Sequence, residues 1–288
     1  MVESNHLMEL TWSVAAAVLF GALLHASWNA LIRSSSDKTL DTALLQVLGS
    51  VLGLPLVAVV GWPPAHAWPY LAASVAIHLG YYTALSRAYH HGELGLAYPL
   101  MRGTAPLLVA LSTAAVVGES PSALSWVGVL GVCAGVLALG LSRQALESPR
   151  GAAFALANAI IIAAYTLTDA LGVRASGDAL QYVAALYVVH GWPFALLVLA
   201  RRGAAACWTY SRARWPMAAL GALASMVSYG IALWAMTRAP VATVAALRET
   251  SVLFAALLGT WLLKEAFTPQ RAAGTALILA GVAALRLG

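Results

Sequence analysis

The chain has 288 residues, of which 61% are hydrophobic and only 9% are charged, and its net charge is +5. Soluble globular proteins carry about 25% charged residues, so this composition excludes an ordinary soluble domain. The apolar residues come in long blocks, and a block of about 18 or more can cross a bilayer as a helix. The alternating pattern of a membrane barrel is absent. These features predict an all-α membrane protein with the lipid bilayer as its partner.

Several function classes are excluded by what the chain lacks. Its basic residues are scattered between apolar blocks without an aromatic and basic patch, so we expect no nucleic acid partner. The two cysteines, Cys133 and Cys207, predict neither a disulfide framework nor a metal site. No Walker loop, HExxH or CxxC motif occurs, so we expect no cofactor and no direct use of ATP. The start, MVESNHLMEL, lacks the basic segment of a cleaved signal peptide, so the first span is expected to remain.

Apolar runs between charged or Pro/Gly breaks predict ten transmembrane helices. Their expected ranges are 11–32, 39–61, 67–87, 95–117, 122–142, 150–172, 179–200, 214–237, 240–263 and 269–287. The longest connection, ARRGAAACWTYSRARWP after the seventh span, is also the most basic. In the fifth span, Gly131 and Gly135 have the GxxxG spacing that permits close helix contact. Packing within the chain is the first interpretation of that spacing and a dimer seam the second, so we expect a monomer or a homodimer.

The two halves of the chain contain versions of one unit, which indicates an internal repeat. In the fourth span an arginine precedes a glutamate by 17 residues, and the ninth span repeats this pair in register with two later glycines. With five spans each, the halves face opposite ways, which is the inverted-repeat plan of many secondary transporters. We assign residues 1–145 and 146–288 to two five-helix repeats. The matched pairs are Arg102 and Arg248, Glu119 and Glu265, Gly128 and Gly274, and Gly135 and Gly281.

Particular segments resemble the drug/metabolite transporter superfamily, and specifically its EamA-like ten-helix members. They are HASWNALIR, YPLMRGTAPL and AYTLTDALGVR, with the Gly-rich closing helices GVLGVCAGVLALG and GTALILAGVAAL. The resemblance covers essentially the whole chain, and the first three segments look like a subgroup sometimes linked to phosphonate utilisation. It implies a multi-pass protein of the bacterial inner (plasma) membrane that moves metabolites by an ion gradient or by exchange. It further implies a cavity lined mainly by helices one, three, four, six, eight and nine.

Two arginines inside spans are the strongest candidates for a substrate site. An ionisable side chain within the bilayer costs several kcal/mol unless it is paired or wetted. Arg102 and Arg248 lie at similar depths in spans four and nine, and a guanidinium offers forked donors to carboxylate or phosphate. The alternative is an internal ion pair with Asp169 or Glu249 that locks the halves together. The resemblance favours an anion site, because phosphate–sugar exchangers of the superfamily bind anions with basic residues on their fourth and ninth helices.

Other polar and aromatic residues recur at one-turn spacings, which places them on shared helix faces. Each of them either lines a binding cavity or hydrogen-bonds a neighbouring helix. For Tyr98 a further alternative is an anchor at the membrane interface, and for Asp169 a solvated carboxylate near the end of its span. The histidines and acids are candidates for coupling to a proton or sodium ion, since histidine titrates near neutral pH. The substrate-binding candidates beside the two arginines are Trp28, Asn29, Tyr82, Tyr98, Tyr165 and Tyr229. The coupling or ion-pair candidates are His25, His78, Asp169 and Glu249.

Together these features predict a secondary transporter, an exporter or importer that works by alternating access. The expected substrate is a small polar organic metabolite, anionic or zwitterionic, such as an amino acid, a phosphonate or a sugar phosphate. The first alternative is an integral membrane enzyme acting on a lipid-linked phosphate. The second is a pure channel or a structural assembly factor.

The basic residues predict the orientation of the chain. If the odd-numbered connections share one face, that face carries 11 Lys and Arg residues against 3 on the other. Because cytoplasmic loops carry the excess, both termini are expected outside the cytoplasm. The family resemblance implies the opposite, since many members are thought to keep both termini inside. A tag-accessibility assay decides between them, and a cytoplasmic C-terminus would reject the orientation from charge.

Overall fold

The computed structural model describes residues 10–33, 35–91, 94–140, 149–263 and 268–288; the described side chains exclude those of residues 33, 82–91, 94–98, 259 and 261–263. These residues form helices joined by short connections, and the described part of the chain contains no strand. The elements are α1 (Trp12–Arg33), α2 (Lys38–Val60), the 3₁₀ turn η1 (Ala65–Ala67), α3 (Trp68–His91), α4 (Leu94–Val116), α5 (Ala123–Gly140), α6 (Pro149–Ser176), α7 (Ala179–Arg202), α8 (Ala204–Met236), α9 (Val241–Arg248), α10 (Thr250–Leu263) and α11 (Pro269–Leu287).

Eight helical segments in the described residues are long and apolar enough to cross a membrane. They lie on α1, α2, α4, α5, α6, α7, α8 and the α9–α10 pair. Helices α3 and α11 occupy the expected third and tenth spans but are not among the eight. Helix α11 carries Arg271 in its first turn and Arg286 in its last. The all-helical membrane fold is therefore confirmed, and the number of ten spans stays a prediction.

Local sequence signals explain where the paired helices α2 and α7 begin and end. Each begins after an aspartate whose carboxylate accepts two backbone N–H groups, Asp37 for α2 and Asp178 for α7. This capping satisfies donors that the first turn leaves without partners. Each ends at a glycine with positive φ, Gly61 at 82° and Gly203 at 81°. Glycine adopts this backbone conformation at no steric cost, so both helices stop there.

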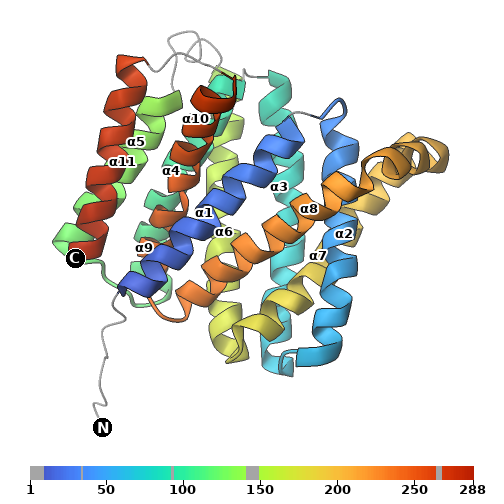
Figure 1. The fold of residues 1–288 in the computed structure, drawn as a ribbon. Helices are drawn as coiled ribbons and strands as arrows, with labels where there is room; N and C mark the ends of the chain where they lie inside the picture. The colour runs from blue at the N-terminus through green and yellow to red at the C-terminus, as the bar shows by residue number, and fades with distance from the viewer. Residues whose placement is uncertain (1–9, 34, 92–93, 141–148, 264–267) are drawn as a thin grey trace.

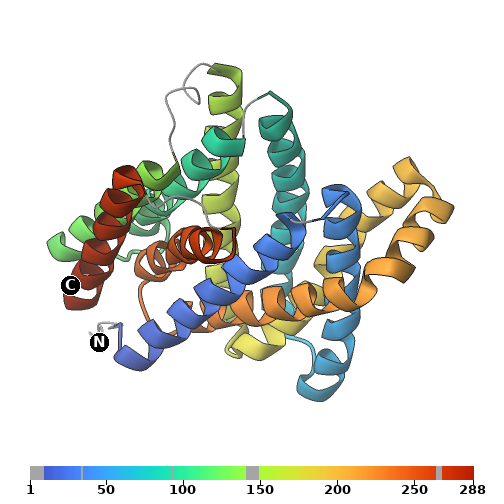
Figure 2. The same cartoon turned by 45° about the horizontal axis from the view of Figure 1, so that its top comes forward.

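Helix α8 begins about three turns before the predicted eighth span. Residues 204–213, read as a basic connection, are the first turns of α8, which has 33 residues. At 1.5 Å per residue, α8 is about 50 Å long, against about 30 Å for the hydrocarbon layer. Its basic turns therefore extend beyond the apolar span instead of ending the helix. Figure 2 shows this end of α8 and the end of α7 projecting from the bundle.

The expected ninth span, 240–263, contains α9 and α10, which are interrupted only at Glu249 and together provide one candidate membrane span. The chain turns at Glu249, whose N–H bonds to the carbonyls of Ala246 and Leu247 at the end of α9. The hydroxyl of Thr250 donates to the carbonyl of Leu247 at 2.8 Å. Threonine side chains compete in this way with the helical hydrogen bonds of the backbone. The Glu-Thr-Ser sequence after Arg248 thus accounts for the break.

The helices pack across the two halves of the chain. Helix α5 lies along α11, α2 along α7, α3 and α4 along α6, and α1 along α8, α9 and α10 (Figure 1). Let the halves be matched in chain order, with α1 equivalent to α6 and α5 to α11. Exchanging the halves then turns α3–α6 into α8–α1, and leaves α2–α7 and α5–α11 unchanged. The main contacts form a set that the exchange preserves.

The seam between α5 and α11 depends on glycines. A Cβ added to Gly131 would lie 3.1 Å from Cα of Gly281, so the two backbones nearly touch. The GxxxG spacing therefore serves packing within the chain, as its first interpretation predicts. The contacts also come in matched pairs at the offset that relates Arg102 to Arg248. These are Gly128 with Leu285 and Gly274 with Leu139, and Gly135 with Ile278 and Gly281 with Val132.

Substitution of a seam glycine tests this packing. In Gly135→Ala, the new Cβ would lie 2.7 Å from the carbonyl oxygen of Gly274 and 2.8 Å from the backbone nitrogen of Ile278. Neither backbone atom can rotate away, so we expect the free energy of unfolding to fall by about 1 to 3 kcal/mol. Thermal or denaturant unfolding in micelles measures this. The matched control is Gly80→Ala in α3, where no atom lies within 4 Å of the new Cβ. Equal stability of the two variants would contradict the seam.

Candidate functional site

A buried ion pair joins the two halves of the chain. Arg102 of α4 places Nε 2.7 Å from Oε2 of Glu249, the residue at the α9–α10 break. Its Nη2 also donates to Oγ of Ser251 at 3.2 Å. Arg102 is 8% exposed and Glu249 5% exposed. Of the two partners that the sequence left open for an ion pair, Glu249 is therefore the partner of Arg102.

Arg248 and Glu249 are adjacent in sequence but contact different side chains. Successive side chains of a helix point about 100° apart, so Arg248 and Glu249 diverge from the end of α9. The guanidinium carbon of Arg248 lies 5.0 Å from the ring centroid of Tyr229 on α8. A cation over an aromatic ring is attracted by the negative face of the ring. Within the described residues, Arg248 forms no ion pair.

Tyr229 connects Arg248 to a second buried carboxylate. Its hydroxyl donates to Oδ2 of Asp169 on α6 at 2.5 Å, and the hydroxyl of Tyr182 donates to Oδ1 at 3.0 Å. Asp169 has no exposed surface. A buried carboxylate is costly unless hydrogen bonds satisfy its oxygens, and the two phenols do so here. A single aromatic ring therefore lies between a half-buried cation and a buried acid.

The predicted histidine of the third span lies among aromatic rings. Nδ1 of His78 donates to the carbonyl oxygen of Ser74, one turn earlier, at 2.8 Å. Its ring stacks on Tyr165 with centroids 4.3 Å apart, and meets the ring of His190 edge-on at 4.4 Å. Tyr165 and Tyr229 pack in one cluster with Met101, the neighbour of Arg102. The structure thus brings His78, Tyr165 and Tyr229 to the same region as the arginines.

The candidates on α1 form a smaller group. His25 and Trp28 meet edge-to-face with centroids 5.0 Å apart. The side-chain amide of Asn29 donates to the carbonyl of His25 at 2.8 Å, which is a bond within its own helix. The indole N–H of Trp28 is buried, and it has no hydrogen-bond partner among the described residues. Trp28 therefore presents a donor that suits a ligand oxygen. The two remaining candidates, Tyr82 and Tyr98, have side chains outside the described ones.

Sequence reasoning missed Tyr182, the second donor to Asp169. A signal for it lies at Gly172, one turn after Asp169 on α6. A Cβ at Gly172 would collide with the hydroxyl of Tyr182, so only glycine leaves room for this tyrosine. In the sequence alone, a glycine one turn from an intramembrane acid is compatible with many arrangements. Only the packing of α7 against α6 identifies Tyr182 as the side chain that needs this space. Ser251 was missed for the same reason, because it reaches Arg102 from another helix.

A second ion pair closes one end of the bundle. Glu119, which follows α4, binds Nη2 of Arg174 through Oε1 at 2.6 Å and accepts the N–H of Val241 through Oε2 at 2.9 Å. Nε of Arg174 donates to the carbonyl oxygen of Met236 at 2.8 Å. Pro240 supplies no side-chain cap to α9, so Glu119 caps that helix from the other half. Glu119 and Arg174 together therefore link the ends of α4, α6 and α8 to the start of α9.

Replacing one member of the Arg102–Glu249 pair should cost more stability than replacing both. Arg102→Met leaves the carboxylate of Glu249 buried without its cation, which typically costs about 3 to 5 kcal/mol of stability. Adding Glu249→Met removes the remaining charge, so the double variant should recover most of that loss. Unfolding of the two single variants and the double variant measures the coupling. Additive losses would show that the two side chains do not interact.

Comparison with known proteins is consistent with these features. Residues 149–287 match the model of the EamA-like transporter family. A solved structure described as a crystal structure of a protein has the same fold, with a TM-score of 0.73 and 22% identity, covering 96% of this chain and 98% of that one. No curated protein matches the chain. The second half of this multi-pass membrane protein is therefore similar to the EamA-like transporter family.

Proposed function

We propose that the protein is a secondary transporter of a small anionic or zwitterionic metabolite in the bacterial inner membrane. The carrying observation is that, among the described residues, Arg102 forms an ion pair and Arg248 forms none. Glu249 neutralises Arg102, whereas Arg248 lies over the ring of Tyr229. The guanidinium of Arg248 is the group that receives a carboxylate, phosphonate or phosphate of the substrate. Amino acids, phosphonates and sugar phosphates all carry such a group.

An inverted repeat supports an alternating-access mechanism. The packing pairs that survive exchange of the halves, and the matched glycine contacts of α5 and α11, support a two-fold relation between residues 1–145 and 146–288. In transporters of this plan, the substrate binds at the interface of the repeats near the middle of the membrane. The arginines lie at equivalent positions of the two repeats. The proposed site is therefore at the interface that the transport cycle rearranges.

The break between α9 and α10 has a defined part in this proposal. Discontinuous helices commonly form substrate sites in secondary transporters, because the break places charge and backbone groups at the site. Here the break sets Glu249 on Arg102 and leaves Arg248 for the substrate. The Arg102–Glu249 pair holds the fourth and ninth spans together, and the indole N–H of Trp28 provides a further donor for a substrate oxygen.

Asp169 and His78 are the proposed coupling groups for a proton or a sodium ion. Tyr229 donates to Asp169 and packs against Arg248, so a change of charge at Asp169 acts on the substrate cation through one side chain. Ion binding and substrate binding are then linked, which secondary transport requires. The Glu119–Arg174 pair is the proposed gate that closes one end of the bundle while the other end opens.

The substrate class can be narrowed before transport is measured. A bound ligand raises the unfolding temperature in proportion to ln(1 + [L]/Kd), so a thermal screen over amino acids, phosphonates and sugar phosphates ranks them. The best ligand is then used in sealed liposomes. An enzyme acting on lipid-linked phosphate would alter its substrate chemically, whereas a transporter moves it unchanged across the membrane.

Arg248→Ala should abolish or strongly weaken uptake into liposomes. Loss of a charge-assisted hydrogen bond corresponds to about 10- to 100-fold weaker substrate binding, and Arg248→Lys should recover part of it. The matched control is Arg238→Ala, since exposed Arg238 lies over Trp234 at the same distance of 5.0 Å, at the end of α8. Unchanged transport by Arg248→Ala would remove the anion site and leave the transporter proposal intact. Absence of transport by the unmodified protein would remove the transporter proposal itself.

A further inference from the structure

One buried acid of the structure has no cation. The described part of the chain contains three buried carboxylates, those of Asp41, Asp169 and Glu249. Glu249 pairs with Arg102 at 2.7 Å, and Asp41 lies 3.6 Å from Nε of Arg214. Asp169 is the most deeply buried of the three and forms no ion pair among the described residues. Its negative charge is therefore stabilised there by hydrogen bonds and not by a paired cation.

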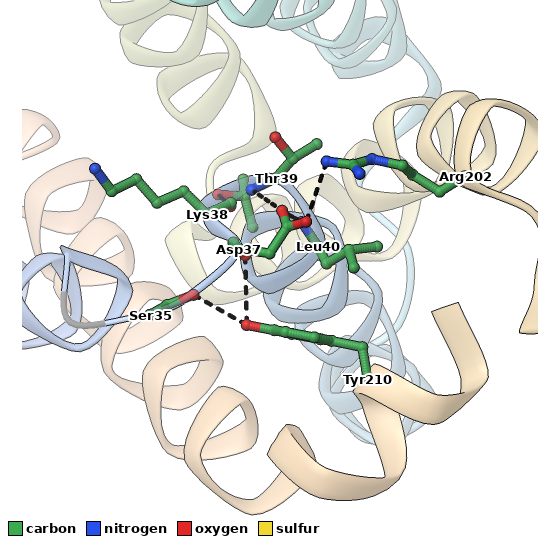
Figure 3. A network of polar contacts seen from close by, with 8 residues as sticks. Ser35, Asp37, Lys38, Thr39, Leu40, Arg202 and Tyr210 are labelled. Carbon is green, nitrogen blue, oxygen red and sulfur yellow. Dashed lines mark hydrogen bonds and ion pairs between the residues drawn. The ribbon is translucent and has the colours of Figure 1, made fainter. Parts of the chain in front are cut away.

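Two acids nearer the surface also have cations. Oδ2 of Asp37, at the start of α2, lies 3.1 Å from Nη2 of Arg202 (Figure 3), and Glu119 binds Arg174 at 2.6 Å. A surface ion pair contributes little to stability, whereas a buried carboxylate without a cation is costly in its charged form. Asp169 thus carries its charge where that charge costs most. A bound proton removes the charge, and with it the cost.

The side chains around Asp169 offer it hydrogen-bond donors. The hydroxyls of Tyr182 and Tyr229 donate to its two oxygens, at 3.0 and 2.5 Å. On α3, the hydroxyl of Ser74 also faces the acid. His78, one turn after Ser74, is half-buried and lies within electrostatic reach of Asp169. The titratable groups that surround the acid, directly or through one neighbour, are Tyr165 on α6, His78 on α3, Tyr182 and His190 on α7, Tyr229 on α8 and Arg248 on α9.

These surroundings suit a proton better than a sodium ion. Transporters commonly coordinate sodium with backbone carbonyls of an unwound helix. Helix α6 runs through Asp169 from Pro149 to Ser176, so its carbonyls there remain in helical hydrogen bonds. At the break after α9, the carbonyls of Ala246 and Leu247 accept the N–H of Glu249. A phenol hydroxyl, in contrast, donates to an ionised carboxylate and accepts from a protonated one, so the same cage holds both forms.

Protonation of Asp169 changes the charge that Arg248 presents to a substrate. The ring of Tyr229 lies 5.0 Å from the guanidinium carbon of Arg248, and its hydroxyl lies 2.5 Å from the carboxylate. Opposite charges separated by one ring in a medium of low dielectric attract each other appreciably. Loss of the negative charge therefore leaves Arg248 with a stronger attraction for an anion. Arg102 does not compensate, because Glu249 already neutralises it.

We propose that Asp169 binds a proton and that the protein carries its anionic substrate together with this proton, in the same direction. The inference rests on the proposed transport function and names its coupling ion and the sign of the coupling. A proton on Asp169 strengthens anion binding at Arg248, and by reciprocity a bound anion strengthens proton binding. Exchange in opposite directions requires the reverse, in which the proton and the substrate weaken each other's binding.

Infrared spectroscopy of the full chain in lipid nanodiscs tests the proton site without a substrate. On acidification, the unmodified protein should show a C=O stretching band of a protonated carboxyl that Asp169→Asn lacks. Asp41→Asn is the matched control, since it replaces a buried aspartate that has a cation, and it should keep the band. At least one of Tyr182→Phe and Tyr229→Phe should keep the band and move its frequency, because each removes a hydrogen bond from the carboxyl.

Binding of anions tests the sign of the coupling. The probes are alanine, methylphosphonate and glucose phosphate, one from each proposed substrate class. Asp169→Asn has a permanently neutral side chain, so at a pH where the infrared band is absent it should bind the accepted probe about tenfold more tightly than the unmodified protein. Acidification should raise the affinity of the unmodified protein and of Asp41→Asn toward that of Asp169→Asn. A merely structural role of Asp169 predicts weaker binding instead.

Each failure has a distinct meaning. A carboxyl band that does not respond to pH, survives in Asp169→Asn or keeps its frequency in both tyrosine variants would overturn the proton site. So would an unfolding temperature that is higher in sodium chloride than in potassium chloride, with the difference abolished by Asp169→Asn. Weaker anion binding by Asp169→Asn would overturn transport of proton and anion together. If the unmodified protein binds none of the three probes, the proposed anion site and the joint transport fail, whereas a band lost in Asp169→Asn would still establish the proton site.

Discussion

The cost of burying charge in an apolar medium governs the centre of this protein. Arg102 and Glu249 are both nearly inaccessible and lie 2.7 Å apart, so neither is tolerated without the other. Their pairing requires the fourth span to lie against the break between α9 and α10. It also leaves Arg248 to the ring of Tyr229. Because Glu249 is paired with Arg102, Arg248 is the arginine that remains as the candidate substrate cation.

The two halves are alike in packing and unlike in charge. The glycine contacts between α5 and α11 recur at one offset in both directions, as expected of a backbone pair related by exchange. At that offset Glu249 corresponds to Gly103, which packs against Leu137 instead of an arginine. Asp169 corresponds to Leu23. The packing contacts therefore match between the halves, whereas Asp169 and Glu249 have no acidic counterpart in the first half, and this asymmetry is what distinguishes Arg102 from Arg248.

Helix positions were predictable because lipid imposes a minimum apolar length and requires every backbone group to be paired. The residues at which helices begin and end were less predictable. Charge ends an apolar span without ending a helix, because arginine is a good helix former, so α8 continues through its basic turns. The break at Glu249 could not be predicted, because an apolar run indicates that a segment lies in the membrane and does not indicate that its helix is continuous. Of the candidate residues, the pairs within one helix were evident from spacing, and the pairs between helices were not.

The sequence by itself determined an all-helical membrane protein, the matched arginines and the glycines of the closing helices, because these depend on composition and on spacing along one chain. The tertiary structure decided which acid neutralises Arg102 and which phenols bind Asp169. Those choices depend on distances between segments far apart in sequence. A carboxylate selects its cation by proximity in a medium of low dielectric, and only the packed helices determine that proximity.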